Sequence, residues 1–363
     1  MQAGEWRVLA INPGSTSTKI AVYANDRAEF ERNLDHSESE MEQFRGRPIL
    51  DQLEFRQSCI ERELSEAGYL LEQFDAVVGR GGLMRPVASG TYKVNEAMLD
   101  DLRSTRYGEH ASNLGAFLAQ VIGRKAGAEA FIVDPVSVDE FTETARISGS
   151  ALAGRQCLSH ALNTKAVVKR YAREQGRSYA ELRLVVAHLG SGISVSAHEG
   201  DKMIDVNVAG QEGTFAMDRS GGLQIQKVIQ LCFSGKYTEK GLWNLLNREG
   251  GVYSYLGTKD LREVERRIEA GDRQAALIFD AMVYQTAKDI GAMATVLNGR
   301  ADAVLLTGGM ARSEKLVDQL RKAIQWIAAV TVYPGEDELQ ALAEGAMRVQ
   351  CGEEQARELE QDV

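Results

Sequence analysis

Cysteine and proline are scarce in this 363-residue chain, and each scarcity excludes a class of protein. The four cysteines are widely spaced and form no Cys-x-x-Cys pair, so the sequence predicts neither a zinc site nor dithiol redox chemistry. Only five prolines accompany 35 glycines. That balance is typical of an α/β protein with many tight loops, and it argues against a disordered or fibrous chain.

Basic charge and long apolar runs are also lacking. The formal net charge of −10 argues against a nucleic-acid-binding surface, so any phosphate group must be held by local side chains and backbone amides. No apolar run approaches the roughly 18 residues of a membrane span, and no secretory leader pattern opens the sequence. We therefore expect a cytoplasmic protein of roughly two domains that binds neither membranes nor nucleic acid.

Two loops rich in glycine and serine, each between apolar strands, are the most informative feature. The first is Asn-Pro-Gly-Ser-Thr-Ser-Thr-Lys at 12–19, and the second is His-Leu-Gly-Ser-Gly at 188–192. Small residues let backbone N–H groups approach an anion closely, and hydroxyl groups add donors. Either loop alone would more often be an ordinary turn. The repetition predicts a duplicated domain that holds one phosphate chain.

The remaining sequence alternates between strand and helix patterns. Strands are expected at 8–11, 20–23, 75–78, 90–94, 130–133, 184–187, 193–197, 303–306 and 331–335. Helices are expected at 37–67, 111–125, 161–175, within 225–298, up to 324 and from 336 onward. After the strand at 303–306, Gly308 and Gly309 form a strand–glycine–helix turn that suits a nucleotide.

Several motifs together resemble the acetate and butyrate kinase family. They are residues 12–19 and 188–192, Asp-Arg-Ser-Gly-Gly at 218–222 and Thr-Gly-Gly-Met at 307–310, with Gly-Arg-Gly-Gly-Leu at 79–83 and Ser-Gly-Ser-Ala at 148–151 resembling the butyrate kinase branch. The resemblance implies an α/β fold of duplicated ribonuclease-H-like domains, as in sugar kinases, Hsc70 and actin, with ATP in the cleft between them. The N-terminal domain would be 1–146, completed by a C-terminal helix at about 340–363, and the nucleotide-binding domain would be 147–339.

The resemblance also implies an activity. ATP and a short-chain carboxylate, such as butyrate or isobutyrate, would be converted reversibly to ADP and an acyl phosphate by direct in-line transfer, with Mg²⁺ and in a homo-oligomer. Such transfer depends on aligning the reactants and neutralising charge on the moving phosphoryl group. An acetate or propionate kinase is the nearest alternative. An ATP-binding, actin-like switch module without an acyl substrate is an alternative from another class.

Five residues match catalytic positions of the family: Asn12, Arg80, Asp134, His160 and Arg219. The planar guanidinium of Arg219 suits carboxylate and phosphoryl oxygens. The chain departs from the acetate kinase pattern at two of these places. Acetate kinases carry their arginine a few positions earlier than Arg80. At the position of a second family histidine, near His160, this chain has Thr164.

The same resemblance assigns binding residues. Phosphate and nucleotide would be bound by Gly14, Ser15, Ser17, Lys19, His188, Gly190, Ser191, Gly192, Gly308 and Gly309. The substrate would be bound by Arg80, His110 and Arg219, and Mg²⁺ by Asn12, Asp134 and Glu338. Glu336 and Asp337 stay open as alternatives to Glu338, because all three acids also suit the start of a helix.

Overall fold

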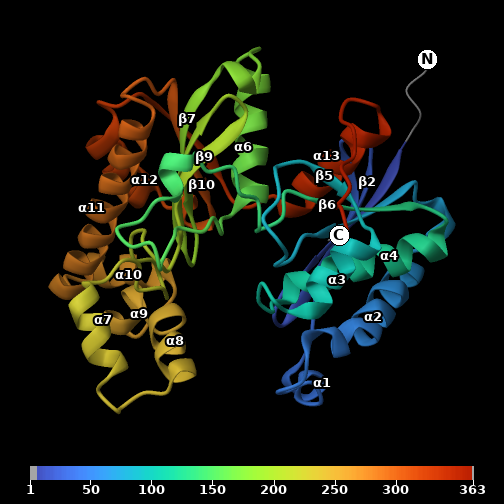
Figure 1. Ribbon diagram of the computed structural model, residues 1–363, viewed down its shortest axis with the longest axis horizontal. Coiled ribbons are helices and arrows are strands. Elements are labelled where there is room, and N and C mark those ends of the chain that lie inside the picture. The colour runs from blue at the N-terminus through green and yellow to red at the C-terminus, as the bar shows by residue number, and fades with distance from the viewer. Residues whose placement is uncertain (1–5, 362–363) are drawn as a thin grey trace. The chain divides into compact units, whose positions relative to one another are not determined.

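The computed structural model describes residues 6–361 and divides into two compact units (Figure 1). Unit 1 contains the residues up to Val138 and those from Asp337 onward, and unit 2 contains Asp139–Glu336. Unit 2 is thus inserted in the sequence of unit 1. Each unit is built around its own mixed β-sheet.

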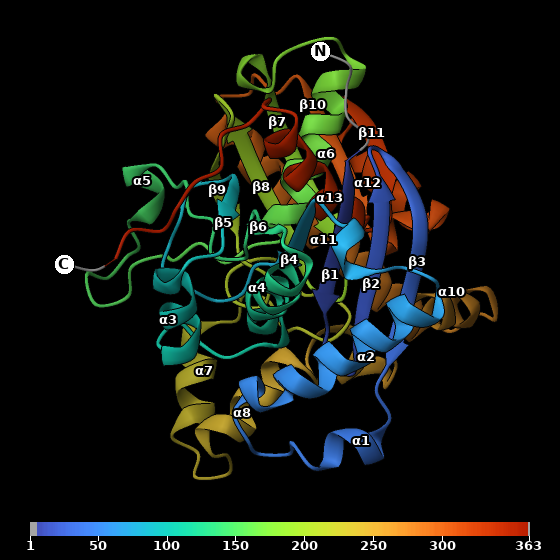
Figure 2. The same cartoon turned by 90° about the vertical axis from the view of Figure 1, so that its right-hand side faces the viewer.

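The sheet of unit 1 has six strands in the order β3-β2-β1-β4-β6-β5 (Figure 2). They are β1 Arg7–Pro13, β2 Ser17–Ala24, β3 Arg27–Asp35, β4 Ala76–Arg80, β5 Thr91–Lys93 and β6 Glu129–Val133. The first three strands form an antiparallel meander, and β1, β4 and β6 run parallel. The C-terminal ends of these three parallel strands therefore meet at one edge of the sheet.

Helices cover both faces of this sheet. They are α1 Glu38–Glu42, α2 Leu53–Glu66, α3 Glu96–Ser104, α4 Leu114–Ala126 and α13 Glu338–Gln350, with short 3-10 turns at Ile49–Gln52, Leu71–Gln73 and Ala111–Asn113. Ile132 packs in one core cluster with Phe117 of α4, whereas Val133 contacts Gly345 of α13. Because successive strand residues point to opposite faces, α4 and α13 lie on opposite faces of the sheet.

Two helix predictions for unit 1 are wrong in extent. The helix expected at 37–67 is interrupted after α1, where Gly46 has a φ of 74° and Pro48 follows. A left-handed glycine and a proline that lacks an N–H group both break a helix. The last helix ends at Gln350 and does not continue through the C-terminal segment, which instead joins the sheet edge through backbone hydrogen bonds between Arg357 and β5.

The sheet of unit 2 repeats the plan of unit 1, with the strand order β11-β10-β7-β8-β9. The strands are β7 Arg183–Leu189, β8 Ile193–Glu199, β9 Lys202–Asn207, β10 Ala303–Gly308 and β11 Ala329–Pro334. Here β7, β8 and β9 form the meander, and β10 and β11 run parallel to β7. The order β3-β2-β1-β4-β6 corresponds strand by strand to β9-β8-β7-β10-β11, so the predicted duplication is confirmed.

The helices of unit 2 are α5 Glu143–Arg146, α6 Ala161–Glu174, α7 Ile225–Cys232, α8 Glu239–Asn247, α9 Gly251–Leu256, α10 Leu261–Glu269, α11 Arg273–Val296 and α12 Glu314–Ile324. The long helix α11 packs on β7 and β8 and supplies much of the core through Ile278, Phe279 and Met282. Among the described residues, no helix is both long and apolar enough to span a membrane.

Candidate active site

The first glycine- and serine-rich loop is a tight turn between β1 and β2. The backbone N–H of Gly14 donates to the carbonyl of Ser17 over 2.8 Å, which leaves Ser15 and Thr16 exposed at the tip. Asn12 and Lys19 are opposite each other in the antiparallel register, so their side chains lie on the same face of the hairpin. Asn12 is buried and Lys19 is exposed.

Asn12, Arg80 and Glu338 form a cluster at the edge of the unit 1 sheet where the parallel strands end. The Arg80 Nη1 donates to Glu338 Oε2 over 2.8 Å, and the Asn12 amide nitrogen donates to the same oxygen over 2.6 Å. Glu338 is the first residue of α13, where the helix dipole favours a negative charge. The structure thus brings together three predicted residues that are up to 326 positions apart in sequence.

Asp134 and His110 lie in unit 1 as well, each with local partners. Asp134 directly follows β6 with a φ of 38°, and its Oδ1 accepts from the Ser89 hydroxyl over 2.6 Å and from the Gly90 N–H over 2.8 Å. His110 is exposed, and its Nδ1 lies 2.9 Å from the Ser112 hydroxyl. Asp134 therefore stands at the same sheet edge as Asn12 and Arg80, because β6 is the neighbour of β4.

Two stacked histidines stand beside the second loop, in unit 2. The rings of His160 and His188 are 3.9 Å apart and nearly parallel, at 8°. His160 immediately precedes α6, and its Nδ1 lies 2.9 Å from the Ser194 hydroxyl. The buried His188 ring lies between Asn163 Oδ1, at 2.9 Å from Nδ1, and Glu336 Oε1, at 3.1 Å from Nε2. These contacts fix the plane of each ring.

Arg219 lies against the second loop. A Cβ atom built on Gly192 would come within 2.4 Å of the Arg219 Nη1, so only glycine leaves room for the guanidinium in this position. The side chain is half-buried and takes part in no ion pair with the described residues. An unpaired, partly desolvated guanidinium is suited to bind an anion through two parallel hydrogen bonds.

A pocket of about 940 Å³ opens in unit 2 next to the second loop. Most of its walls come from the second loop, the β10–α12 connection and the segment from the end of α9 to α10, and Met217 and Glu336 complete it. The lining residues are Gly190, Ser191, Met217, Gly257, Thr258, Lys259, Asp260, Leu261, Arg262, Glu265, Gly309, Met310, Arg312, Ser313 and Glu336. Gly308 itself does not line this pocket. Its φ of 94° and the Leu189 carbonyl, 2.4 Å from a Cβ built there, require glycine for close packing instead.

The expected metal ligands are oxygen donors of unit 1. Glu338 accepts both of its hydrogen bonds at Oε2, and its Oε1 accepts none from the described residues. The Asn12 amide oxygen is 3.5 Å from Arg80. Carboxylate and amide oxygens fit a hard divalent cation that keeps several waters. Among the described residues, however, no group of three His, Cys, Asp or Glu side chains is preassembled for a metal ion.

Comparison with solved structures defines the fold class. An acetate kinase from Porphyromonas gingivalis superposes with a TM-score of 0.78 at 18% identity, covering 94% of this chain and 99% of that one. A propionate kinase from Francisella tularensis subsp. tularensis SCHU S4 superposes with a TM-score of 0.74 at 17% identity, covering 93% and 98%. The chain therefore has the fold of acetate and propionate kinases, as the duplicated sheets also indicate.

The sequence comparisons show the family. A model of the acetokinase family matches residues 152–346. A probable butyrate kinase from Listeria monocytogenes serotype 4b is 48% identical over 352 residues, covering 97% of this chain and 99% of that protein. Butyrate kinase 2 from Clostridium acetobutylicum is 47% identical over 354 residues, again covering 97% and 99%. The chain belongs to the acetokinase family, whose members are carboxylate kinases that use ATP with a divalent metal ion.

Several residues and roles in the two sites were not predicted. Asn163 and Ser194 hold the two histidines together with Glu336, which the sequence analysis named only as an alternative metal ligand. The segment from Gly257 to Glu265 forms one wall of the unit 2 pocket. Arg56, fully buried beneath the first loop, was also missed. For these residues the sequence offers no local motif, because each acts through a neighbour that is distant along the chain.

Proposed function

We propose that this protein is a butyrate kinase, which transfers a phosphoryl group reversibly and directly between ATP and a short-chain carboxylate to give an acyl phosphate and ADP. The observation that carries the proposal is the 48% identity, over 97% of the chain, to a probable butyrate kinase. The loops and the unpaired Arg219 support it, because in-line transfer depends on groups that position and neutralise phosphoryl oxygens. Isobutyrate and other branched acids are included in the proposed substrate range.

The unit 2 pocket is the proposed site for the nucleotide. Its volume of about 940 Å³ is near the upper end of the range for pockets that enclose small ligands. Gly190, Ser191 and Gly309 line it, and Gly192 and Gly308 belong to the same two turns. The N–H groups of Gly190 and Gly308 already donate to the Gly192 and Gly335 carbonyls, so the backbone amides of Ser191, Gly192 and Gly309 would bind phosphate oxygens. His188 is held beside them by Glu336.

Arg219 and His160 are the proposed ligands of the phosphoryl group in transit. The Arg219 guanidinium is in no ion pair with a described acid, and the neighbouring Asp218 is paired with Lys259, so its donors would be available to oxygens of the moving group. Stacking on His188 and the contact with Ser194 would hold the His160 ring in the orientation needed to donate a hydrogen bond. Fixed donors of this kind stabilise developing charge without reorganising during the reaction.

The unit 1 cluster is the proposed site for the carboxylate and the metal ion. Arg80 and His110 would bind the acid, while Asn12, Asp134 and Glu338 would supply oxygen ligands for Mg²⁺. Bound Mg²⁺ neutralises charge on the phosphate oxygens. Glu338 is favoured over its two neighbours, because Glu336 is paired with His188 in unit 2 and Asp337 precedes the helix. Ser15, Ser17, Gly14 and Lys19 of the hairpin would contact phosphate oxygens.

The preferred chain length of the carboxylate is the most specific part of the proposal. One methylene group is worth only about 1–3 kcal/mol in an apolar pocket, so neighbouring acids are expected to react at graded rates. An acetate or propionate kinase shares the fold and is the nearest alternative. A homo-oligomeric state and a location in the cytoplasm complete the proposal.

The rate of acyl-phosphate formation tests the proposal. Hydroxylamine traps the product with Mg-ATP and each acid from acetate through propionate, butyrate and isobutyrate to valerate. We expect the highest kcat/KM at four carbons and its near-complete loss in Arg219→Ala. A maximum at acetate would assign the chain to the sister activity. Tight ATP binding without activity on any acid would favour an ATP-dependent switch and overturn the proposal.

A further inference from the structure

A fully buried arginine lies beneath the first phosphate loop. Arg56, in the first turn of α2, has no exposed surface, and it donates five hydrogen bonds. Its Nη1 binds the Ser17 carbonyl and the Thr18 hydroxyl, each at 2.9 Å, and its Nη2 binds the Ser15 carbonyl at 3.2 Å. Nε and Nη2 both bind Gln52 Oε1, at 3.0 and 2.9 Å. The guanidinium thus connects α2 to the turn of the β1–β2 hairpin.

These bonds set the direction of the peptide groups in the loop. In a trans peptide the C=O and the following N–H point in opposite directions. Because the Ser15 carbonyl is turned inward to Arg56, the Thr16 N–H must point outward. The Thr16 carbonyl likewise accepts from the His36 N–H at 2.9 Å. Ser15 and Thr16 are exposed, and their N–H groups donate to no acceptor among the described residues. They are therefore available to an anion.

The charge of Arg56 has no acidic partner. The four atoms that accept its five hydrogen bonds are all neutral, and it forms no ion pair with any described Asp or Glu. Burial lowers the pKa of Arg56 to about 10, so the guanidinium remains charged at neutral pH. A buried positive charge without a counter-ion is costly unless it is hydrogen-bonded, and it attracts an anion more strongly than an exposed charge does.

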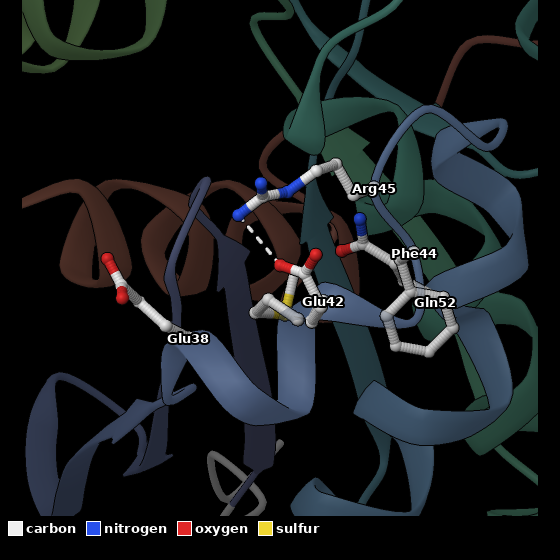
Figure 3. A pocket seen from close by; sticks show the side chains of 6 residues that line it. Glu38, Glu42, Phe44, Arg45 and Gln52 are labelled. Carbon is white, nitrogen blue, oxygen red and sulfur yellow. Dashed lines mark ion pairs between the residues drawn. The ribbon is translucent and has the colours of Figure 1, made fainter.

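Gln52 is the residue that keeps this charge uncompensated. It is 7% exposed and lines a small pocket of about 240 Å³ together with Glu38, Glu42 and Arg45 (Figure 3). Its amide oxygen accepts two hydrogen bonds from Arg56, which a carboxylate of the same shape would accept equally well. A glutamate at this position would preserve the contacts but neutralise the pair.

We infer that Arg56 is a positioning residue for phosphate: through the Ser15 carbonyl it turns the Thr16 N–H of the first loop outward, and it adds an uncompensated positive charge beneath the loop. The inference rests on the proposed function for its ligand, the phosphate chain of ATP. Arg56 contacts the loop and does not contact the reacting atoms. Gln52 has the supporting role of a neutral acceptor.

The test measures the binding of ATP and of adenosine, by calorimetry, to the full-length protein. Gln52→Glu neutralises the charge and keeps the hydrogen bonds, whereas Arg56→Lys keeps the charge but cannot span the Ser15 and Ser17 carbonyls. Gln43→Glu, at an exposed position close in sequence, is the matched control for added negative charge. Thermal unfolding of each variant reports on folding.

We expect both test variants to bind ATP about tenfold more weakly and to bind adenosine as the wild type does, since hydrogen bonds and charges around an anion carry effects of this size. A purely structural Arg56 predicts that Gln52→Glu matches Gln43→Glu in ATP affinity, and that result would overturn the inference. Equal weakening for ATP and adenosine would overturn it too. The test measures binding and not catalysis. A wild-type protein that binds ATP but lacks the proposed kinase activity would therefore overturn the proposed function without deciding the inference about Arg56.

Discussion

At the scale of single residues, the position of the Arg219 guanidinium depends on the absence of a side chain at Gly192. The guanidinium occupies the space that a Cβ of Gly192 would fill, at 2.4 Å from Nη1 and 2.8 Å from Cζ. Both atoms are at the far end of a flexible side chain. An added methyl group can therefore displace the guanidinium, whereas the Ala209 Cβ, at 3.1 Å, needs to move by only a few tenths of an ångström. The position of the charge is thereby separated from the stability of the fold.

Gly192→Ala is expected to lower kcat on the order of 100-fold, because a shift of about 1 Å in a positioning group has effects of that size. The unfolding temperature should change little, since Gly192 has no positive φ, the guanidinium can move and the Ala209 Cβ has to give by only a few tenths of an ångström. Steady-state kinetics with butyrate and a thermal melt measure the two quantities on the same sample.

Gly149→Ala is the control for this substitution, because a Cβ at Gly149 meets no atom within 4 Å. It should keep wild-type kinetics. Undiminished kcat in Gly192→Ala would show that Arg219 does not act from its observed position. A large fall in unfolding temperature would instead assign Gly192 a structural role.

At the scale of elements, a buried polar layer joins the β1–β2 hairpin to α2. His36 Nε2 lies 2.9 Å from the Thr18 hydroxyl, which also accepts from Arg56. Burial first, and then the Arg56 charge, lower the pKa of His36 from its ordinary value of 6.5. Glu40 and Asp35 oppose this shift. The folded hairpin therefore favours the neutral imidazole.

This layer predicts a pH dependence of stability. Unfolded His36 binds a proton near pH 6.5 and folded His36 only at lower pH, so its contribution is complete above pH 6.5 and is lost as the pH falls through the folded pKa. The free energy of unfolding, from urea titrations at pH 7.5 and 5.5, should fall more in the wild type than in His36→Gln. His198, whose pKa burial and then Lys165 lower well below 6.5, contributes equally to both proteins. Equal falls in the two would contradict the prediction.

The local sequence predicted the helices, strands and turns better than it predicted the contacts between distant segments. Both hairpins, the strand–glycine–helix turn and most helices were correct, because apolar periodicity and turn residues act over a few positions. The contact of Glu338 with Asn12 and Arg80 depends on the crossover that returns the last helix to the first sheet. The sequence did not predict the role of Arg56, because an arginine in a helix normally indicates an exposed face.

At the scale of the whole molecule, one surface of unit 2 carries several exposed apolar side chains on neighbouring helices. Ile225 and Ile229 of α7 and the following Phe233 are 75%, 51% and 86% exposed. They recur every four residues and so form one stripe on the helix. Trp243 of the neighbouring α8 is 55% exposed. An apolar stripe of this kind marks an interaction surface, and a second copy of the chain is its expected partner.

The proposed homo-oligomer is therefore expected to form through this stripe. Ile229→Glu combined with Phe233→Glu should convert it to a monomer near the chain mass of 39.8 kDa, measured by light scattering after size-exclusion chromatography. Charges buried in an apolar interface without partners cost more than the contacts can offset. Leu152→Glu is the control, because that leucine is 99% exposed outside the stripe and its replacement should leave the mass unchanged. A monomeric wild type would refute the oligomer, and an oligomeric double variant would place its interface elsewhere.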